Sequence, residues 1–284
     1  MREELNVLRQ YDRPQDRIRQ HRQADQSPVL VVEGVDDLRV LEDHLVGVTI
    51  FPVGGKPPAL AVTAALEGWG IQGFLCLIDH DFDGFPNPGK AGHRLRVYPK
   101  RDLEGWLVDI GVLASLLKHH SSSAKVDVVG GVKVVVEECK EAASPVTNLR
   151  KINAARQLGL AFDEVDLSSK VDLRTGKVDV DSYLESLRSA SDTRRSYDEV
   201  REWASEVCDD GRGPRGKDVV EIAGVHLRKR LASLPHQAVG VDLMCANLRS
   251  GAALAVATDD WFIGFCLEVR NLSEELGLGV GGPP

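Results

Sequence analysis

Four short, mostly apolar segments in the first third of the chain are predicted strands, and the first of them is a continuous run rich in β-branched residues. They cover residues 29–32, 48–51, 73–78 and 95–98. Such runs are typical of strands that are buried on both faces of a parallel sheet. Residues 36–46 carry apolar residues three and four positions apart, which predicts a helix. Further helices are predicted over about residues 54–69 and, after the fourth segment, 102–117. Because strands and helices alternate, we expect an α/β fold with a mostly parallel sheet flanked by helices.

The second half of the chain is predicted to form a mainly helical lobe. Residues 126–136 are rich in valine and fit either a strand or the start of a helix. A helix is expected after Pro145, and Gly176 is expected to supply the left-handed residue of a hairpin over residues 171–180. Asp181 is placed to cap the next helix. Helices are predicted over residues 181–187, 197–207 and 261–272, and one more beginning near Lys217.

These patterns predict four parts of the chain. They are a charged N-terminal arm or helix (1–27), an α/β domain (28–120), a mainly helical C-terminal lobe (121–276) and a flexible Gly/Pro-rich tail (277–284). The arm holds six arginines among acids and glutamines. A charge run of this kind is typical of a solvated surface, and contact with phosphate or a partner is the alternative.

Composition narrows the classes of protein. The chain has 43 acidic and 35 basic residues and a formal net charge of −8, so an action on nucleic acid would need a local basic track or bound cations. No apolar run approaches the roughly 20 residues that span a bilayer, and the N-terminus has no signal-peptide core. We therefore expect a cytoplasmic protein without a membrane segment. The five scattered cysteines predict reduced, mostly buried thiols and no zinc site.

Acidic residues follow two of the predicted strands. Glu33 ends the first strand, and Asp79, Asp81 and Asp83 follow the third. In an open parallel sheet, ligands bind outside the carboxyl ends of the strands. Converging carboxylates repel one another unless a divalent cation neutralises them, and oxygen ligands favour Mg²⁺ or Mn²⁺. The alternative is a turn whose aspartates cap a helix or bond their own backbone.

Two lysines at predicted helix starts are candidates for contact with phosphate. Lys56 follows Gly54-Gly55 and precedes Pro57, so it is either a phosphate anchor at a positive helix N-terminus or an exposed lysine. Lys217 either stabilises charge on a transferred phosphoryl group or merely precedes a helix that Asp218 caps, and the second interpretation is favoured.

A basic segment follows the acidic loop directly. Its cations are Lys90, Arg94, Arg96, Lys100 and Arg101. They would flank a metal site at the strand ends and could follow a nucleic-acid backbone. A solvated basic rim is the alternative.

Four pieces of sequence, in this order and spacing, resemble the Toprim domain, the metal-dependent phosphoryl-transfer module of topoisomerases, primases and OLD-type nucleases. The pieces are Val32-Glu33-Gly34 with Asp37, Gly54-Gly55-Lys56, Ile78-Asp79-His80-Asp81-Phe82, and Asp102-Leu103-Glu104. The chain is most similar to the single-Toprim proteins encoded beside ABC-type ATPases in bacterial anti-phage systems such as PARIS.

The resemblance implies a Toprim-like fold and a nuclease that hydrolyses phosphodiester bonds in DNA or RNA with one or two Mg²⁺ or Mn²⁺ ions. It implies that Glu33 is a metal ligand or general base and that Asp79 and Asp81 hold the metal. Glu104 would serve a second ion, and Asp83 would extend the cluster or only shape the loop. A partner ATPase would control the activity, and a homo-oligomer is compatible with the sequence. The alternatives are a non-catalytic Toprim-like sensing or scaffolding module and a phosphohydrolase for a small nucleotide.

Overall fold

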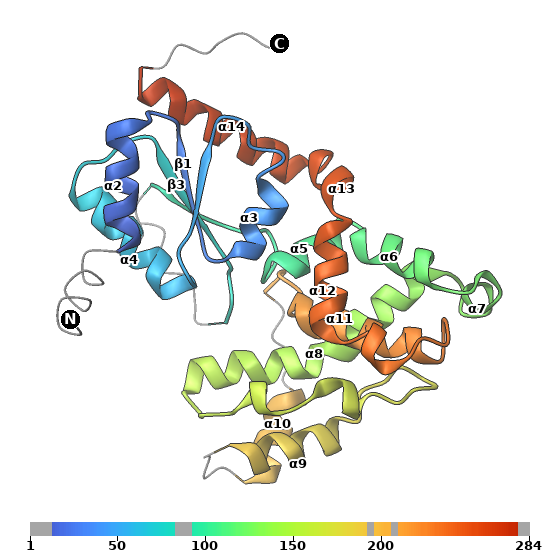
Figure 1. Cartoon of the computed structure of the whole chain (residues 1–284). Helices are drawn as coiled ribbons and strands as arrows, with labels where there is room; N and C mark the ends of the chain where they lie inside the picture. The colour runs from blue at the N-terminus through green and yellow to red at the C-terminus, as the bar shows by residue number, and fades with distance from the viewer. Residues whose placement is uncertain (1–12, 83–92, 192–195, 206–209, 278–284) are drawn as a thin grey trace, which may run out of the picture. The chain divides into compact units, whose positions relative to one another are not determined.

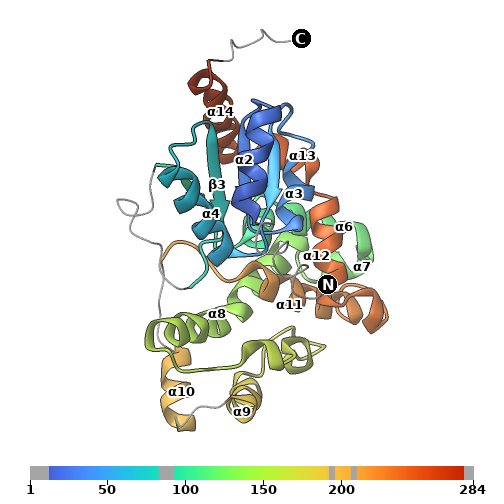
Figure 2. The same cartoon turned by 60° about the vertical axis from the view of Figure 1, so that its left-hand side comes forward.

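The computed structural model describes residues 13–82, 93–191, 196–205 and 210–277 (Figures 1 and 2). Asp83 and Lys90, two of the candidate residues, lie outside these ranges. The chain divides into two compact units. Unit 1 comprises Met1–Asp79, Phe85–Tyr98 and Val256–Pro284, and unit 2 comprises His80–Gly84 and Pro99–Ala255.

Unit 1 is built on a parallel sheet of four strands. These are β1 (Val29–Val32), β2 (Thr49–Pro52), β3 (Phe74–Ile78) and β4 (Leu95–Val97), in the order β2-β1-β3-β4. All three pairings are parallel, which confirms the predicted α/β class. Every residue of the central strands β1 and β3 is buried, as their continuous apolar runs indicate.

Helices cover both faces of this sheet. Figure 1 shows α2 (Pro14–Ala24) and α4 (Lys56–Gly68) on one side, and α3 (Val35–Leu41) and α14 (Asp260–Glu275) on the other. The first face is a dry core because alternate strand residues point into it. It contains Ile18, Val29, Val31, Ala59, Val62, Leu66, Phe74, Cys76 and Ile78.

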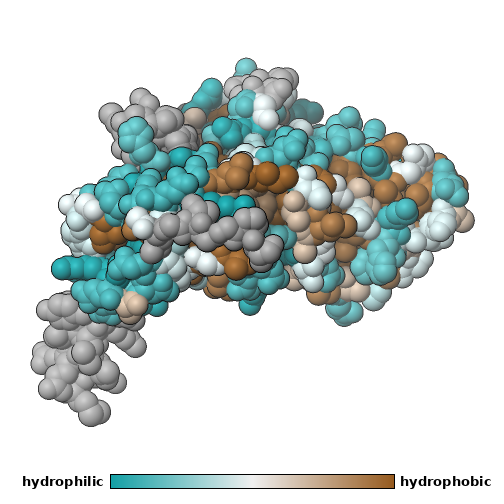
Figure 3. Space-filling model, turned by 90° about the horizontal axis from the view of Figure 1, so that it is seen from above, coloured by the Kyte–Doolittle hydropathy of each residue, from teal (hydrophilic) through white to brown (hydrophobic). Residues whose placement is uncertain are grey.

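The last helix, α14, is apolar on two sides. Its side chains Phe262, Phe265 and Val269 are buried, whereas Ile263 and Leu267 are 46% and 54% exposed. Figure 3, which views the molecule from above Figure 1, shows apolar side chains exposed among hydrophilic ones. Isolated exposed apolar residues are normal on a protein surface and by themselves assign no partner.

Unit 2 is helical throughout its described part, apart from loops and one isolated β-bridge. Its helices are α5 (Leu103–Asp109), α6 (Val112–His120), α7 (Ser123–Val128), α8 (Val132–Arg156), α9 (Val180–Ala190), α10 (Tyr197–Ser205), α11 (Gly216–Arg228) and α12 (Val241–Ser250). Short 3-10 helices cover Phe162–Glu164, Leu167–Lys170 and His236–Ala238, and α13 (Ala253–Ala257) precedes α14. The predicted mainly helical second half is thus observed.

Several predicted boundaries differ from those observed. The single helix expected over residues 102–117 is broken at Gly111, whose φ of +92° begins a new helix. The valine-rich residues 126–136 form no strand: α7 ends at Val128, a turn with Gly130 and Gly131 follows, and α8 begins at Val132. Pro145 lies inside α8 instead of before it. The expected hairpin is reduced to one antiparallel bridge between Val171 and Val178, with Gly176 left-handed as predicted.

The cap of α9 is also a correction. Asp179, not Asp181, accepts a hydrogen bond from the amide of Ser182, at 3.0 Å. The cysteines agree with expectation where they are described: Cys76, Cys139 and Cys245 are buried free thiols and Cys266 is half-buried. Among the described residues, no helix combines the length and apolar character that crossing a membrane requires.

Candidate functional site

Glu33 and Asp79 meet at the carboxyl edge of the sheet in unit 1. Strands β1 and β3 pair in parallel with Val32 opposite Leu77, so both strands end at the same edge. The amide of Asp79 donates a hydrogen bond of 2.8 Å to Oε1 of Glu33. Two acidic residues that are 46 positions apart in the chain therefore lie side by side.

The glycine turn after β2 is hydrogen-bonded to Glu33 as well. The amides of Gly54 and Gly55 both donate to the main-chain carbonyl of Glu33, each at 2.8 Å. Their φ angles of +91° and +118° lie in the left-handed region that favours glycine, so another residue would strain this turn. Three strand ends are therefore hydrogen-bonded around Glu33.

Lys56, the residue after this turn, opens α4 and is only 6% exposed. The alternative of an exposed helix-start lysine is therefore wrong. Burying an ammonium group is costly unless other groups compensate its charge. Its position at the positive end of α4, directly after the turn that is bonded to Glu33, is compatible with a phosphate anchor.

Asp37, part of the first Toprim-like piece, has a structural role. Its Oδ2 accepts from the amide of Gly34 at 2.8 Å, and its Oδ1 accepts from the Tyr98 hydroxyl at 2.8 Å. The carboxylate is 7% exposed. Asp37 thus fixes the start of α3 and the backbone that follows Glu33.

Asp81 belongs to unit 2 and is held through its backbone. Its φ is +51°, which is uncommon for a residue other than glycine. Its amide donates to the carbonyl of Arg101 at 3.0 Å, and its carbonyl accepts from the Arg101 guanidinium at 2.6 Å. These reciprocal bonds define the conformation of the second half of the D-x-D motif.

Arg101 is 1% exposed, and its guanidinium also forms a two-pronged ion pair with Asp210 at 2.6 and 2.7 Å. It is therefore not accessible to a nucleic-acid backbone, and it connects segments of unit 2 instead. In unit 1, Arg94 pairs with Glu275 at 2.8 Å and Arg96 pairs with Glu268 at 2.5 Å. Lys100, in unit 2, pairs with Asp109 at 3.2 Å. Four of the five predicted nucleic-acid contacts thus have acidic partners.

Asp102 connects the starts of α5 and α11. Its Oδ1 accepts from the amides of Gly105 and Gly216, each at 2.8 Å, so one carboxylate caps both α5 and α11. Burial, and then repulsion from Glu104, raise the pKa of Asp102. The interpretation in which Asp218 caps α11 is wrong, because Asp218 is buried in an ion pair with Arg150 at 3.0 Å.

Glu104 lies beside this junction and is 2% exposed. Its Oε1 accepts from Arg249 of α12 at 2.6 Å. Glu104 also interacts electrostatically with the ammonium group of Lys217. Burial lowers the pKa of Lys217, but the negative charges of Glu104 and Asp102 raise it by more, so the pKa lies above its usual value. Glu104 is therefore already neutralised by cations of its own unit, and a metal ion would have to compete with them.

The donor chemistry of the edge fits a hard cation. Mg²⁺ is commonly held by one or two carboxylates, with water and substrate phosphate as its other ligands. The Glu33 carboxylate lies at this edge beside the backbone of Asp79, whose side chain is the candidate for a second ligand. Within the described ranges, which exclude Asp83, the structure contains no group of three or more acidic, histidine or cysteine side chains placed to hold one ion. Convergence of Asp81 and Glu104 on the ion therefore stays a prediction.

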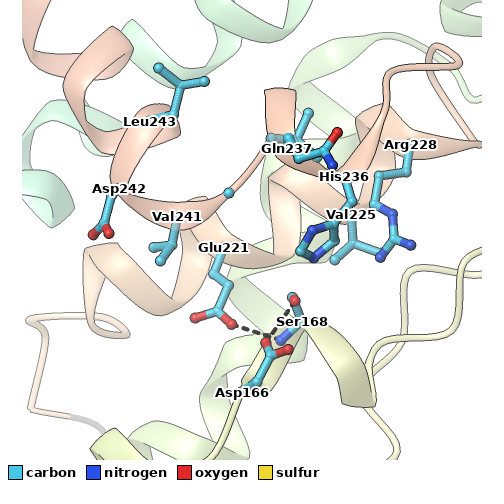
Figure 4. A pocket seen from close by; sticks show the side chains of 12 residues that line it. Asp166, Ser168, Glu221, Val225, Arg228, His236, Gln237, Val241, Asp242 and Leu243 are labelled. Atoms are coloured by element: carbon cyan, nitrogen blue, oxygen red, sulfur yellow. Dashed lines mark hydrogen bonds between the residues drawn. The ribbon is translucent and has the colours of Figure 1, made fainter.

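A second acidic pair, which the sequence reasoning missed, lines a cavity of about 410 Å³ in unit 2 (Figure 4). Oε1 of Glu221 accepts from the amide of Ser168 at 2.7 Å, and Asp166 accepts from the Ser168 hydroxyl at 2.7 Å. Burial raises the pKa of Glu221 to about 7. The sequence does hold a signal, since Glu221 is a single carboxylate within the apolar run Val219–Ala223.

Comparison with known proteins does not identify a family for the chain. No protein-family model matches the chain, and no curated protein matches it.

Proposed function

We propose that the chain is a Mg²⁺- or Mn²⁺-dependent nuclease of the Toprim type, which hydrolyses phosphodiester bonds in DNA or RNA. The observation that carries the proposal is the hydrogen-bonded pair of Glu33 and Asp79 at the carboxyl edge of a parallel sheet. This edge is where open α/β sheets bind their ligands.

The surroundings of the pair support the same chemistry. The turn at Gly54 and Gly55 is bonded to Glu33, and it leads into the buried Lys56 at the start of α4. The acid Glu33 follows β1, the cation Lys56 follows β2 and the amide of Asp79 follows β3, so three successive strand ends contribute to the site. Such a combination suits a substrate that carries both negative charge and a phosphorus centre.

In the proposed reaction, Asp79 and Asp81 would hold the metal, and Glu33 would be a ligand or would accept the proton of the attacking water. When bound, the ion supplies charge stabilisation for the phosphoryl oxygens. Lys56 offsets the negative charge of the substrate phosphate. The amide of Asp79 orients the Glu33 carboxylate, because it already donates to Oε1.

The Toprim resemblance also suggests the setting of this activity. The proposed protein would be an effector of anti-phage defence that a separate ABC-type ATPase controls. The chain itself has no G-x-x-x-x-G-K-S/T motif, so nucleotide hydrolysis would come from the partner.

The test is cleavage of labelled DNA and RNA by the full chain, with Mg²⁺, with Mn²⁺ and with chelator. We expect metal-dependent cleavage that Glu33→Gln reduces by about 10²-fold or more, since a positioned acid–base group contributes on that scale. Glu67→Gln, an exposed acid on α4, is the matched control and should cleave like the wild type. Equal rates for Glu33→Gln and the wild type would contradict the assignment.

A further inference from the structure

The cavity of about 410 Å³ in unit 2 has groups of opposite charge at two points of one helix face. Glu221, Val225 and Arg228 of α11 all line this cavity. Because residues at spacings of three, four and seven lie on one side of a helix, the three side chains share a face. Seven residues of helix rise about 10 Å, so the valine lies between the attachment points of the carboxylate and the guanidinium.

The acidic end of the cavity is oriented by Ser168. Its amide donates to Oε1 of Glu221 and its hydroxyl donates to Asp166, each at 2.7 Å. Figure 4 shows Asp166, Ser168 and Glu221 together, with Arg228 to their right in this view. Within the described ranges, no ion pair engages the side chain of Asp166, Glu221 or Arg228. The cavity therefore presents hydrogen-bond acceptors at one end and donors at the other.

The rest of the lining favours an uncharged ring. Val225, Val239, Val241 and Leu243 line the cavity with apolar side chains. Asp242 adds a third carboxylate, so acids outnumber the single arginine of the lining and an anionic group such as a phosphate is disfavoured. The volume lies within the range of about 300–1,000 Å³ for ligand pockets. A ligand that fits this lining has apolar faces and polar edges, as a nucleic-acid base does.

The separation of acceptors from donors selects among the bases. An ionised carboxylate only accepts hydrogen bonds, and a guanidinium only donates them. Guanine carries two donors side by side, N1–H and the N2 amine, on its Watson–Crick edge, and two acceptors, O6 and N7, on its Hoogsteen edge. An arginine that donates to O6 and N7 is the commonest base-specific contact in protein–DNA complexes. Adenine has an acceptor at N1, so its lone pair would face a carboxylate that has no proton to donate.

We propose that this cavity binds a guanine base, with Glu221 accepting from N1–H and the N2 amine and Arg228 donating to O6 and N7. Asp166 adds negative charge beside the donor edge of the base. The base must be unpaired, because base pairing occupies the Watson–Crick edge. It belongs either to a free nucleoside or nucleotide or to a single strand. Binding of guanine goes beyond the proposed nuclease function; only a role in choosing the cleavage site would rest on that function.

The test measures binding of guanosine, inosine and adenosine to the full chain by calorimetry. It is made at pH 8, because burial raises the pKa of Glu221 to about 7 and the carboxylate accepts both hydrogen bonds only when it is ionised. Inosine lacks only the N2 amine and should bind about tenfold more weakly than guanosine, the scale of one hydrogen bond to a charged group. Adenosine should bind about 100-fold more weakly or not at all.

Two variants separate the two ends of the cavity. Glu221→Gln should weaken guanosine binding about tenfold and bring the guanosine-to-inosine affinity ratio close to one, because the contact with the N2 amine is lost. Arg228→Gln should weaken guanosine and inosine equally, because both carry O6 and N7. Glu185→Gln and Lys229→Gln, exposed residues of the same unit outside the cavity, are the matched controls and should bind like the wild type.

An oligothymidine strand with one central guanine, and the same strand with inosine in its place, are measured with chelator and distinguish the sources of the base. If the guanine strand binds more tightly than guanosine, the source is nucleic acid; if more weakly, it is a free nucleoside or nucleotide. Equal affinity for guanosine and adenosine would overturn the proposal, as would no binding of guanosine or of the guanine strand, or a guanosine-to-inosine ratio unchanged by Glu221→Gln. Guanine binding without metal-dependent cleavage rejects the nuclease alone, and cleavage without guanine binding rejects the cavity alone.

Discussion

The carboxylate of Asp102 accepts a hydrogen bond from the amide of Gly216, 114 residues further along the chain. The same oxygen caps α5 through Gly105, so two helix N-termini share one buried acid. The backbones approach so closely that a Cβ at Gly216 would lie 1.9 Å from the amide nitrogen of Gly105. This junction organises the centre of unit 2.

The close approach predicts that Gly216→Ala destabilises the protein by about 2–4 kcal/mol, because the backbones must separate to admit the methyl group. Urea unfolding measures the change. Gly264→Ala on α14 is the control, because its added Cβ meets nothing within 4 Å beyond the adjoining backbone of its own helix. A helical Gly-to-Ala change should be neutral or stabilising by about 0.5–1 kcal/mol. A similar loss of unfolding free energy in both variants would contradict the close backbone contact at Gly216.

The proposed metal site predicts stabilisation by Mg²⁺. An ion that binds only the folded chain raises its free energy of unfolding by about 2.7 kcal/mol at 100 times its Kd. The melting temperature should therefore rise with Mg²⁺ in the wild type and rise less in Asp79→Asn. Asp43→Asn, an exposed acid of the same unit, should respond like the wild type. A melting temperature that does not change with Mg²⁺ would count against the proposed metal site.

Arg101 should matter for stability more than for binding. Replacing it with Met removes its hydrogen bonds to Asp81 and Gly213 and its ion pair with Asp210, which keeps Lys151 at 3.3 Å. The expected loss is about 2–4 kcal/mol. Burial alone would raise the pKa of Asp210. Its hydrogen bonds with the Arg101 guanidinium and the Arg212 amide, together with the charges of Arg101 and Lys151, lower this pKa to about 2.

The sign of the pH dependence follows from that lowered pKa. A carboxyl with a depressed folded pKa stabilises the protein above its unfolded pKa, and this contribution disappears as pH falls toward 2. The difference between the wild type and Arg101→Met should therefore narrow between pH 4 and pH 2. Arg39→Met, which breaks an exposed pair with Asp36, should change stability by less than about 1 kcal/mol at any pH.

Glu221 predicts the opposite pH dependence. Its pKa of about 7 in the folded chain exceeds the usual value of about 4.3, so the folded state binds the extra proton. Its stabilising contribution is complete below pH 4 and is lost as pH rises through 7. Glu221→Gln stays neutral, so between pH 5 and pH 8 the wild type should lose stability relative to it, on the order of 2 kcal/mol.

Chemical unfolding at a series of pH values tests this. Glu185→Gln, an exposed acid on α9, is the control and should follow the wild type. Parallel pH profiles for Glu221→Gln and the wild type would show that Glu221 is ionised in the folded protein.

The sheet was predictable because its signal is local. The strands β1 and β3 are continuous apolar runs, and their burial on both faces demands such runs. The pairing of Glu33 with Asp79 followed from the rule that parallel strands end at one edge. Lys56 was less predictable, because sequence spacing places it at a helix start without fixing its burial.

Other features depend on contacts between distant residues. Apolar spacing continues through residues 102–117, and the glycine at position 111 is a weak signal, because an isolated glycine is tolerated inside many helices. A proline usually starts or stops a helix, yet Pro145 lies inside α8, where packing against neighbouring helices outweighs the lost hydrogen bond. The ion pairs that engage Arg94 and Arg96 come from α14, more than 170 residues away, and no charge pattern near them reveals it.

The two ends of the chain both contribute to unit 1, since α14 packs against β3. A ribosome that has made the sheet must therefore synthesise all of unit 2 before the helix that covers one face of the sheet emerges. During that interval the strands expose apolar surface, and the nascent chain should depend on chaperones. Truncation before residue 256 should leave an insoluble product even though every proposed metal ligand is present.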